Sequence, residues 1–173
     1  MMACYLERTW VSHKLRPGKS PIHGEGVFAT APIGPGELVM EFGGELVTAD
    51  MLGDYREPSA WAVRGGLYLA LRNTDTEDSL DEYLNHSCDA NTWLTGETTL
   101  VARRHIAADE EITLDQGTWN FDEADYADDG RACTCNAVSC RGVLTHNDWR
   151  RTDVQARYLG HFHPLVQAMI DAG

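Results

Sequence analysis

Four of the five cysteines in this chain are spaced so that two distant segments have to meet. Three of them form the run Cys133-x-Cys135-x4-Cys140, and Cys88 stands alone in the polar stretch 85–91. Four thiolates are the usual closed ligand set of a structural zinc ion, and the run of three supplies one too few. We therefore predict that Cys88 completes a zinc site and that the chain folds back on itself. The alternative is free buried thiols that pack as small apolar side chains.

Length and composition favour one domain with a small appendage, because 173 residues with 43% hydrophobic content can bury one substantial core. No apolar run approaches the roughly 20 residues that cross a bilayer. The first residues also lack the basic region and apolar core of an export signal. We therefore expect a cytoplasmic protein without a membrane segment. Disulfides rarely persist in that reducing compartment, so Cys4 is interpreted as a spare thiol.

The formal net charge of -13 bears on the partners that the protein can bind. Binding to nucleic acid needs Lys and Arg side chains that displace phosphate counterions, so the charge argues against it. A basic protein or peptide is the better partner. Much of the acid lies in residues 122–129, just before the cysteine run, and would steer a basic peptide inward if it lines a cleft. The acidity is equally compatible with solubility alone.

Short runs rich in β-branched and aromatic residues predict a mainly β fold with short helices and a cysteine-rich loop. Turn residues such as those at 32–36 separate the runs. A first helix is expected over residues 48–56, and a second over 149–158 after a cap at Asn147 or Asp148. Pro164 opens a last one that ends at 170. The apolar face of the first helix is expected to hold Met51, Leu52 and Tyr55. The strands are expected at 27–30, 38–42, 67–71, 98–102 and 111–114.

Five motifs occur in the order found in SET-domain proteins, and on these residues the chain resembles that family. The resemblance covers about residues 12–143, and the final thirty residues resemble the C-terminal extension of compact bacterial members. It implies a SET domain over 12–118, an acidic linker with a zinc-binding post-SET loop over 119–143, and a helical extension over 144–173. The motifs are His23-Gly-Glu-Gly-Val-Phe-Ala29, Gly36-Glu-Leu-Val39, Asn85-His-Ser-Cys88-x2-Asn91, Glu110-Glu-Ile-Thr-Leu-Asp115 and Cys133-x-Cys135-x4-Cys140-Arg-Gly142.

The resemblance implies a β-clip-like fold in which the segment 85–91 and the strand around Ile112 cross as a pseudoknot. Family members bind S-adenosylmethionine on one face and their substrate on the other, and most are protein-lysine N-methyltransferases. The implied zinc ligands are the four cysteines above. Without the family context, the glycine-rich loop would be read as a turn between strands, and His86 as a structural histidine. The positions implied to bind the cofactor are Gly24, Glu25, Gly26, Asn85, His86 and Cys135.

Two positions depart from the family pattern at the place where the methyl group is transferred. Lysine methylation requires a neutral amine aligned with the methyl donor, and family members commonly place tyrosines there. Here Gln116 follows Asp115, and Phe42 stands at the second tyrosine position. Glutamine accepts and donates hydrogen bonds but does not titrate, so transfer should slow by about 10² to 10⁴. Tyr68 is our first candidate to substitute for these tyrosines, with Trp93, Trp119 and Tyr126 as further candidates.

The sequence leaves three functions open. The first is an S-adenosylmethionine-dependent methyltransferase acting on a lysine or another amine, in a basic protein or a small molecule. The second is a repurposed SET-fold enzyme that acts on a small molecule or on the cofactor, and the third is a binding module without catalysis.

Four tryptophans form either a cage for a cation or parts of the core; they are Trp61, Trp93, Trp119 and Trp149. Apolar residues of the tail suit docking onto the core or a dimer contact, so the protein is a monomer or a homodimer; these residues are Trp149, Val154 and Leu159.

Overall fold

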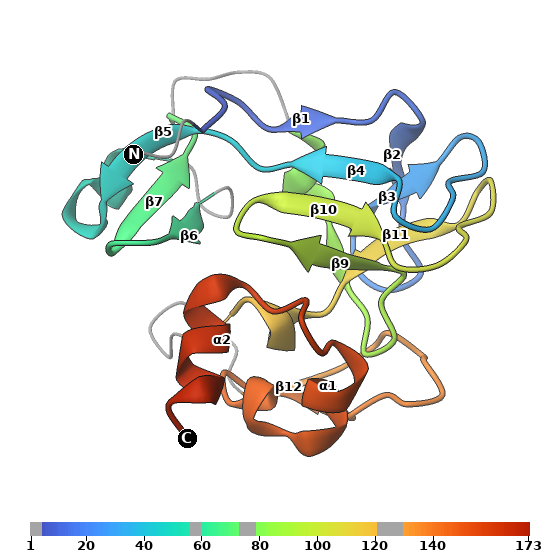
Figure 1. The fold of residues 1–173 in the computed structure, drawn as a ribbon. Helices are drawn as coiled ribbons and strands as arrows, with labels where there is room; N and C mark the ends of the chain where they lie inside the picture. Colours follow the sequence, from blue (N-terminus) through green and yellow to red (C-terminus); the bar gives the residue numbers. More distant parts are fainter. Residues whose placement is uncertain (1–4, 56–59, 73–78, 121–129) are drawn as a thin grey trace.

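The computed structural model describes residues 5–55, 60–72, 79–120 and 130–173. Short strands make up the upper part of the molecule in Figure 1, and the helices near the C-terminus lie below them. In the described residues the strands form two four-stranded sheets, one three-stranded sheet and a two-stranded hairpin. This architecture confirms the mainly β fold with short helices.

The two four-stranded sheets have different topologies. The first is antiparallel, with the order β1-β4-β10-β9. The second has the order β2-β3-β11-β8 and joins β11 to β8 in parallel. The strands of the first sheet are β1 (Trp10–Val11), β4 (Leu38–Glu41), β9 (Thr92–Thr95) and β10 (Thr99–Ala102), and those of the second are β2 (Leu15–Lys19), β3 (Glu25–Ala29), β8 (Asn85–His86) and β11 (Glu111–Leu114).

The smaller sheets and the helices surround this centre. The antiparallel order β5-β7-β6 forms the three-stranded sheet, and β12 pairs with β13 in the hairpin. The strands are β5 (Glu45–Thr48), β6 (Trp61–Val63), β7 (Leu67–Ala70), β12 (Arg131–Ala132) and β13 (Val143–Leu144). The 3-10 helices are η1 (Ala49–Asp54), η2 (Leu80–Tyr83), η3 (Gln116–Thr118) and η4 (Asp148–Arg150), and the α-helices are α1 (Thr152–Arg157) and α2 (Pro164–Asp171).

The main apolar core is built from the inward faces of these strands. Val27 and Ala29 of β3 are fully buried, and Phe28 between them is partly exposed, which is the period-two pattern of a strand. Ile112 of β11 and Leu100 of β10 are buried in the same cluster. All five predicted strands are confirmed, with ends that differ by at most two residues.

Strand β2 was missed because it contains Pro17 and Gly18, residues that usually argue against a strand. It nevertheless pairs with β3 along its full length, from Leu15 opposite Ala29 to Lys19 opposite Glu25. Because β2 is the edge strand of its sheet, a proline there removes no hydrogen bond that a second neighbour would need.

The segment that carries the Asn-His-Ser-Cys motif lies alongside β11, as the family resemblance implied. Asn85 and His86 pair in parallel with Thr113 and Leu114. The side chain of Asn91 then bonds the same strand: its Nδ2 donates to the Glu111 carbonyl at 2.7 Å, and its Oδ1 accepts from the Thr113 N–H at 2.9 Å. These bonds fix the segment beside the centre of the sheet.

The helix predictions are only partly correct. Residues 49–54 form a short 3-10 helix, in which Met51 is 43% exposed instead of packing inward. The helix predicted over 149–158 is split into η4 and α1. Its predicted caps are wrong, because Asn147 makes no side-chain cap bond and the buried carboxylate of Asp148 bonds Arg141 instead. Helix α2 is confirmed, with Pro164 in its first turn.

The C-terminal tail docks onto its own chain. The Tyr158 hydroxyl accepts from the Ala90 N–H at 3.1 Å, and the His161 ring stacks on Trp93 with centroids 3.5 Å apart. Trp149 and Val154 are buried in the same region, as predicted. Leu159 is 79% exposed, so its predicted docking role is wrong.

The predicted boundaries at 12–118, 119–143 and 144–173 stay predictions, and the acidic stretch 122–129 lies outside the described residues. Across the part of the chain that is described, none of the helices is both long and apolar enough to span a membrane.

Candidate functional site

Two cavities meet at one shared wall. The aromatic cavity has a volume of about 160 Å³, and the cysteine cavity has a volume of about 180 Å³. Leu84, His86 and Gln116 line both, so these three residues separate the two spaces. The aromatic cavity is otherwise lined by Phe42, Ala60, Trp61, Asp81, Glu82, Leu114 and Trp119. The cysteine cavity is otherwise lined by Ile22, His23, Asn85, Arg131, Ala132, Cys133, Thr134, Cys135 and Leu144.

Three aromatic rings pack against one another along one side of the aromatic cavity. Phe42 and Trp61 are stacked with centroids 4.0 Å apart, and Trp119 is tilted against Trp61 at 5.0 Å. Because these rings contact each other, they form a wall instead of a cage around a cation. Trp93 and Trp149 belong to the tail contacts, so a cage of four tryptophans is wrong.

Carboxylates and aromatic faces share the aromatic cavity. Asp81 and Glu82 come from η2, and the Thr9 hydroxyl holds Asp81 with a bond of 3.1 Å to its Oδ2. Aromatic faces attract cations through their quadrupole, and carboxylates do so through their charge. The cavity is therefore suited to a positively charged group.

Gln116 is held in the shared wall by its backbone and by its side chain. Its N–H donates to His86 Nδ1 at 3.1 Å, and its Oε1 accepts from Arg131 at 3.4 Å. Asp115 caps η3 directly before it, accepting from the Gly117 N–H at 2.9 Å. Gln116 therefore faces both cavities from a fixed backbone position.

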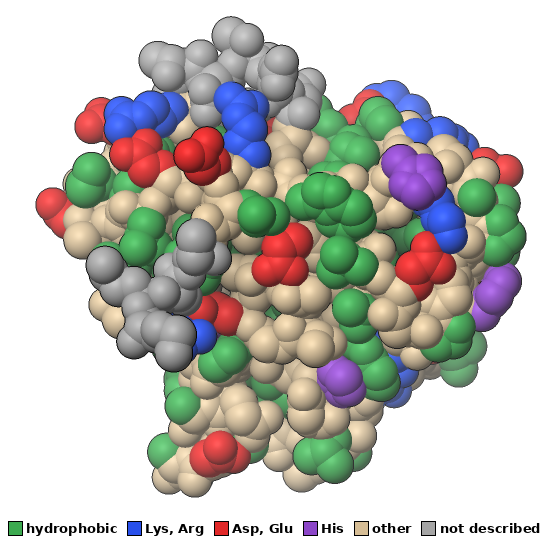
Figure 2. Space-filling model, turned by 45° about the horizontal axis from the view of Figure 1, so that its top comes forward, with side chains coloured by type: hydrophobic (Ala, Val, Ile, Leu, Met, Phe, Trp, Pro, Cys, Tyr) green, Lys and Arg blue, Asp and Glu red, His purple; other side chains and the backbone are tan. Residues whose placement is uncertain are grey.

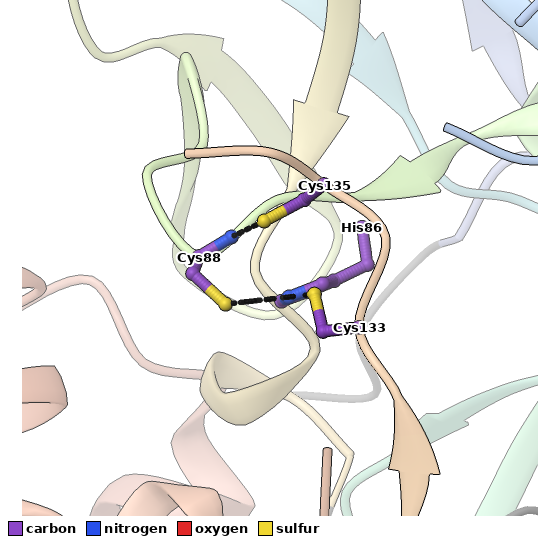
Figure 3. Close-up of side chains that lie close together, drawn as sticks. All are labelled: His86, Cys88, Cys133 and Cys135. Atoms are coloured by element: carbon purple, nitrogen blue, oxygen red, sulfur yellow. Dashed lines mark hydrogen bonds between the residues drawn. The ribbon is translucent and has the colours of Figure 1, made fainter. Parts of the chain in front are cut away.

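Sulfur and imidazole groups gather beside the cysteine cavity (Figure 3). His86 and the three cysteines Cys88, Cys133 and Cys135 each offer a ligand atom within 4.8 Å of the others. Cys140 lies outside that group but packs against the same cluster. All four of these cysteines are free thiols. The structure thus brings together three of the predicted zinc ligands, with the fourth adjacent and His86 as an unexpected neighbour.

Backbone N–H groups donate hydrogen bonds to three of these sulfurs. Arg141 donates to Cys88 Sγ at 3.3 Å, Cys88 to Cys135 Sγ at 3.5 Å, and Gly142 to Cys140 Sγ at 3.4 Å. Hydrogen bonds to the charged form stabilise it. This donor set fits a zinc ion, which binds four thiolates in a closed tetrahedral site.

The surroundings of Cys88, Cys133 and Cys135 shift the pKa values of these thiols in different directions. Burial raises the pKa of Cys133 to about 11 and also raises the pKa of Cys88. Burial also opposes the ionisation of Cys135, but backbone N–H bonds from Cys88 and Ala137 outweigh it and lower the pKa to about 7. Cys135 is therefore ready to ionise, and a divalent cation would have to deprotonate Cys88 and Cys133.

The hydrogen bonds of His86 decide which of its nitrogens faces the sulfurs. Burial lowers the pKa of this histidine to about 4, so its ring is neutral near pH 7. Since Nδ1 accepts from the Gln116 N–H, the ring hydrogen must be on Nε2, which lies 3.2 Å from Cys88 Sγ. A nitrogen that carries hydrogen has no lone pair for a metal. This arrangement makes His86 a donor to Cys88 and leaves the fourth ligand position to Cys140.

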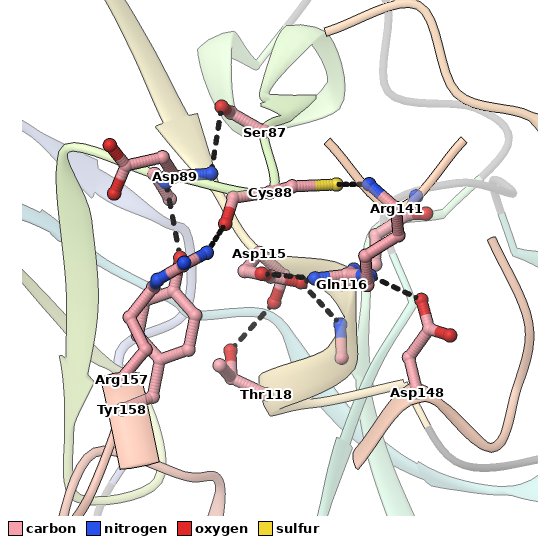
Figure 4. Close-up of polar contacts among 12 residues, drawn as sticks. Ser87, Cys88, Asp89, Asp115, Gln116, Thr118, Arg141, Asp148, Arg157 and Tyr158 are labelled. Carbon is pink, nitrogen blue, oxygen red and sulfur yellow. Dashed lines mark hydrogen bonds and ion pairs between the residues drawn. The ribbon is translucent and has the colours of Figure 1, made fainter. Parts of the chain in front are cut away.

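A buried ion-pair network joins the cysteine loop to the shared wall (Figure 4). Both Arg141 terminal nitrogens bond Asp115 at 2.7 Å, and Nε bonds Asp148 at 2.8 Å. The three side chains are at most 5% exposed. Burial opposes the Arg141 charge, yet Asp115 and Asp148 raise its pKa. Sequence reasoning missed this network, although Arg141 and Asp115 both stand inside the quoted motifs.

One further bond ties the cysteine loop across the cysteine cavity. The Thr134 hydroxyl donates to the Ile22 carbonyl at 2.9 Å, although 112 positions separate these residues in the chain. The cysteine loop and the loop before β3 therefore face each other across this cavity.

Comparison with known proteins now gives the family. The SET-domain family profile matches residues 24–117, which is more than half of the chain. This chain belongs to the SET-domain family. The matched residues include the segment around Asn85 that pairs with β11.

Two curated relatives are histone-lysine N-methyltransferases. ATX2 of Arabidopsis thaliana is 32% identical over 158 residues, and human SETD1A is 33% identical over 145 residues. These alignments cover 83% and 76% of this chain, but this chain spans 14% and 8% of the relatives. Both relatives are eukaryotic, so the bacterial assignment of this SET-domain protein stays a prediction.

A solved structure confirms the SET fold. The methyltransferase domain of human histone-lysine N-methyltransferase SETMAR matches with a TM-score of 0.56 and 19% identity. The match covers 78% of this chain and 58% of that one.

The predicted cofactor loop of this SET domain lies at the edge of the cysteine cavity. Asn85 lines the cavity, and its Nδ2 donates to the carbonyls of His23 and Glu25 at 3.1 and 2.9 Å. A Cβ at Gly26 would come within 2.4 Å of Glu111 Oε1, so this glycine makes room for a side chain of the protein. The lining on this side comes from Ile22 and His23, so cofactor contacts by Gly24, Glu25 and Gly26 stay predictions.

The predicted catalytic residues are only partly brought together. Gln116 and Phe42 both line the aromatic cavity. Tyr68 lies on β7 and packs against the cluster of Val47 and Tyr55, outside the lining of either cavity. Its role as a substitute for the family's tyrosine stays a prediction.

Proposed function

We propose that this chain is an N-methyltransferase that uses S-adenosylmethionine and methylates an amine, with a lysine of a basic protein as the first candidate. One observation carries the proposal: two cavities of different chemistry meet at a wall made of Leu84, His86 and Gln116. A transferase needs donor and acceptor on opposite sides of one short gap. The relatives named as histone-lysine N-methyltransferases support the same reaction.

The cysteine cavity is the proposed site of S-adenosylmethionine, which supplies a methyl group on a positively charged sulfur. Asn85 and His23 line one side, and Cys135, Thr134 and Arg131 line the side made by the cysteine loop. Arg131 would bind the carboxylate end of the cofactor, since a guanidinium pairs well with a carboxylate. Closing of the loop by the Thr134 bond would exclude water from the shared wall.

We further propose that the cysteine loop holds zinc through Cys88, Cys133, Cys135 and Cys140. The backbone donors to three of these sulfurs and the hydrogen on His86 Nε2 support this set over one that includes the histidine. The ion would bind two distant segments together and form one side of the cofactor cavity. Cysteines that bind zinc must stay reduced, which accords with the proposed cytoplasmic location.

The acceptor ammonium would enter the aromatic cavity. Asp81 and Glu82 would attract it, and the ring faces of Trp61 and Trp119 would contact its alkyl chain. Gln116 offers its amide to the nitrogen but cannot remove a proton. The proton must therefore leave to water, and transfer to an ordinary lysine should be slower by about 10² to 10⁴ than with a titrating partner.

A small-molecule amine is the second candidate acceptor, and the chemistry of the wall favours it. Neither Gln116 nor Phe42 supplies the hydroxyl that lysine methylation commonly uses. On the face in Figure 2, acidic and basic side chains of the described residues are interspersed, so no single acidic patch for a basic protein covers that face. The oligomeric state, monomer or homodimer, is compatible with either acceptor.

The test is to incubate the zinc-loaded protein with methyl-labelled S-adenosylmethionine, a pool of lysine-rich peptides and a small-molecule extract. Label on lysine supports the first acceptor, and label on a small molecule supports the second. Tight cofactor binding without labelled product would refute transferase activity and favour a binding module. Gln116→Tyr is the companion variant, because it restores a titrating phenol at the shared wall. If the parent is a slow lysine methyltransferase, this variant should be faster at high pH.

A further inference from the structure

Gln116 is connected to the sulfur cluster by two separate chains of hydrogen bonds. We propose that the metal centre sets the position of Gln116 through His86 and Arg141, so that a change at the metal is transmitted to the wall between the cavities. His86 and Arg141 would then be positioning residues, in addition to the structural role of zinc. The inference rests on the proposed function for its meaning, but its test does not require methyl transfer.

The first connection passes through one imidazole ring. His86 Nε2 lies 3.2 Å from Cys88 Sγ, and Nδ1 accepts from the Gln116 N–H at 3.1 Å. The ring is buried, and β8 and β11 hold its backbone in register. Because an imidazole is rigid, a movement of the sulfur on one side is passed to the backbone of Gln116 on the other.

The second connection passes through Arg141. Its N–H donates to Cys88 Sγ at 3.3 Å, and its guanidinium grips both oxygens of Asp115 at 2.7 Å. Asp115 in turn caps η3, the 3-10 helix that begins at Gln116. The Arg141 guanidinium and the Asp115 carboxylate are both planar and form a buried ion pair. Asp115 therefore has little freedom to move relative to Arg141.

Both connections begin at the same atom, Cys88 Sγ. A sulfur bound to a divalent metal is an anionic acceptor, and hydrogen bonds to charged acceptors are shorter and stronger than those to neutral ones. Metal binding would therefore tighten the bond from His86 and the bond from Arg141 together. Gln116 would be best ordered when the metal is present, which makes the wall between the cavities dependent on the metal.

The experiment is nuclear magnetic resonance of protein labelled with ¹⁵N at glutamine only. The chain has three glutamines, Gln116, Gln155 and Gln167, so three backbone amide signals are expected, and Gln116→Asn identifies one of them. Zinc is then exchanged for ¹¹³Cd, a larger ion that keeps the fold but lengthens every metal–sulfur bond. We expect the Gln116 amide signal to move, while that of Gln167 on α2 stays in place. An unmoved Gln116 signal would overturn the proposal.

Matched variants then separate the two connections. In His86→Asn an oxygen can still accept from the Gln116 N–H, but the contact with Cys88 is lost. In His86→Gln the donor to Cys88 remains, but the acceptor is lost. Arg141→Lys keeps the charge but not the two-pronged grip on Asp115. We expect each variant to reduce the cadmium-induced shift of Gln116 by at least half; an undiminished shift in all three would refute the coupling.

The ¹¹³Cd signal itself reports the ligands. It should keep the position of a four-sulfur site in His86→Asn, because His86 is a donor to the sulfur and not a ligand. A parent signal in the range of a site with three sulfurs and one nitrogen would make His86 a ligand. That result, or a signal that moves in His86→Asn, would overturn the proposal. A normal cadmium response without methyl transfer would leave this inference standing while the proposed function fails.

Discussion

The two cavities are built by different forces. The aromatic cavity is shaped by apolar packing, since Phe42 and Trp61 are at least nine-tenths buried and in contact with the main core. The cysteine cavity depends on hydrogen bonds, an ion-pair network and a sulfur cluster that join segments about 50 residues apart, such as Cys88 and Arg141. Packing tolerates many substitutions of similar volume, whereas a ligand set or a buried charge does not. Substitutions at the cysteine cavity should therefore have larger effects on stability and binding than substitutions at the aromatic cavity.

Loss of a metal ligand should be the largest effect. We expect Cys88→Ser to weaken zinc binding by at least about 10²-fold and to abolish detectable binding of S-adenosylmethionine, because the cysteine loop forms one side of that cavity. Metal analysis and titration calorimetry measure the two effects. Cys4→Ser is the matched control and should change neither quantity. Full cofactor binding by the zinc-free protein would show that the two cavities are independent of the metal.

Breaking the buried ion-pair network should come next. Arg141→Met leaves Asp115 and Asp148 buried without their cation, which should lower the free energy of unfolding by about 3–5 kcal/mol. Urea unfolding measures the change. The control is Arg151→Met, whose partner Asp153 is half exposed, and it should cost at most about 1 kcal/mol. Equal losses in the two variants would mean that the buried network is no stronger than a surface pair.

Protonation of His163 at low pH should weaken the packing behind the aromatic wall, because its ring and that of Trp61 form a T-shaped pair with centroids 5.8 Å apart. Burial lowers the pKa of His163 to about 4, from about 6.5 in the unfolded chain. The unfolded state therefore binds a proton first, so the stabilisation is complete above pH 6.5 and is lost as the pH falls to 4. We expect a loss of about 1–3 kcal/mol over this window.

The variant His163→Asn isolates that effect. Asparagine can cap α2 as the histidine nitrogen does, but it does not titrate. Urea unfolding at several pH values should show a shallower acid loss for the variant than for the parent. Parallel pH curves for the two proteins would contradict the assignment to His163.

The smallest effect is expected at the aromatic wall itself. Trp61→Phe removes the bond of 2.9 Å from Nε1 to the Glu97 carbonyl but keeps an aromatic ring. The free energy of unfolding should fall by about 1 kcal/mol, and KM for the acceptor should rise because the ring is held less firmly. Binding of S-adenosylmethionine should not change. Trp93→Phe, outside both cavities, is the control, and a matching rise in its KM would show that the effect is not local.

The strands and helices that depend only on neighbouring residues were the easiest features to predict from the sequence. The alternation in β3 and the turn residues around each strand were sufficient to locate five strands. Pro164 located α2 for the same local reason. Strand β2 was missed because its position at the edge, which tolerates Pro17, is a property of the sheet and not of the five residues.

The candidate site was predictable in its chemistry but not in its connections. Cysteine spacing and the order of motifs identified the sulfur cluster, the family and Gln116 as a residue near the candidate site. Tyr68 could not be judged from sequence, because any tyrosine can supply a hydroxyl until its sheet is placed. In the same way, Asp148 fits a helix cap by its position in the chain, but a buried guanidinium takes its carboxylate.

The sequence by itself determined which side chains are available and how they are ordered: four thiols in two segments, a glutamine in place of a tyrosine, and alternating strands. The tertiary structure alone decided which nitrogen of His86 faces the sulfur, how Arg141 joins the loop to Asp115, and which residues separate the two cavities. The physical reason is that hydrogen bonds and ion pairs act over about 3 Å. Residues reach that distance only after the strands between them have packed.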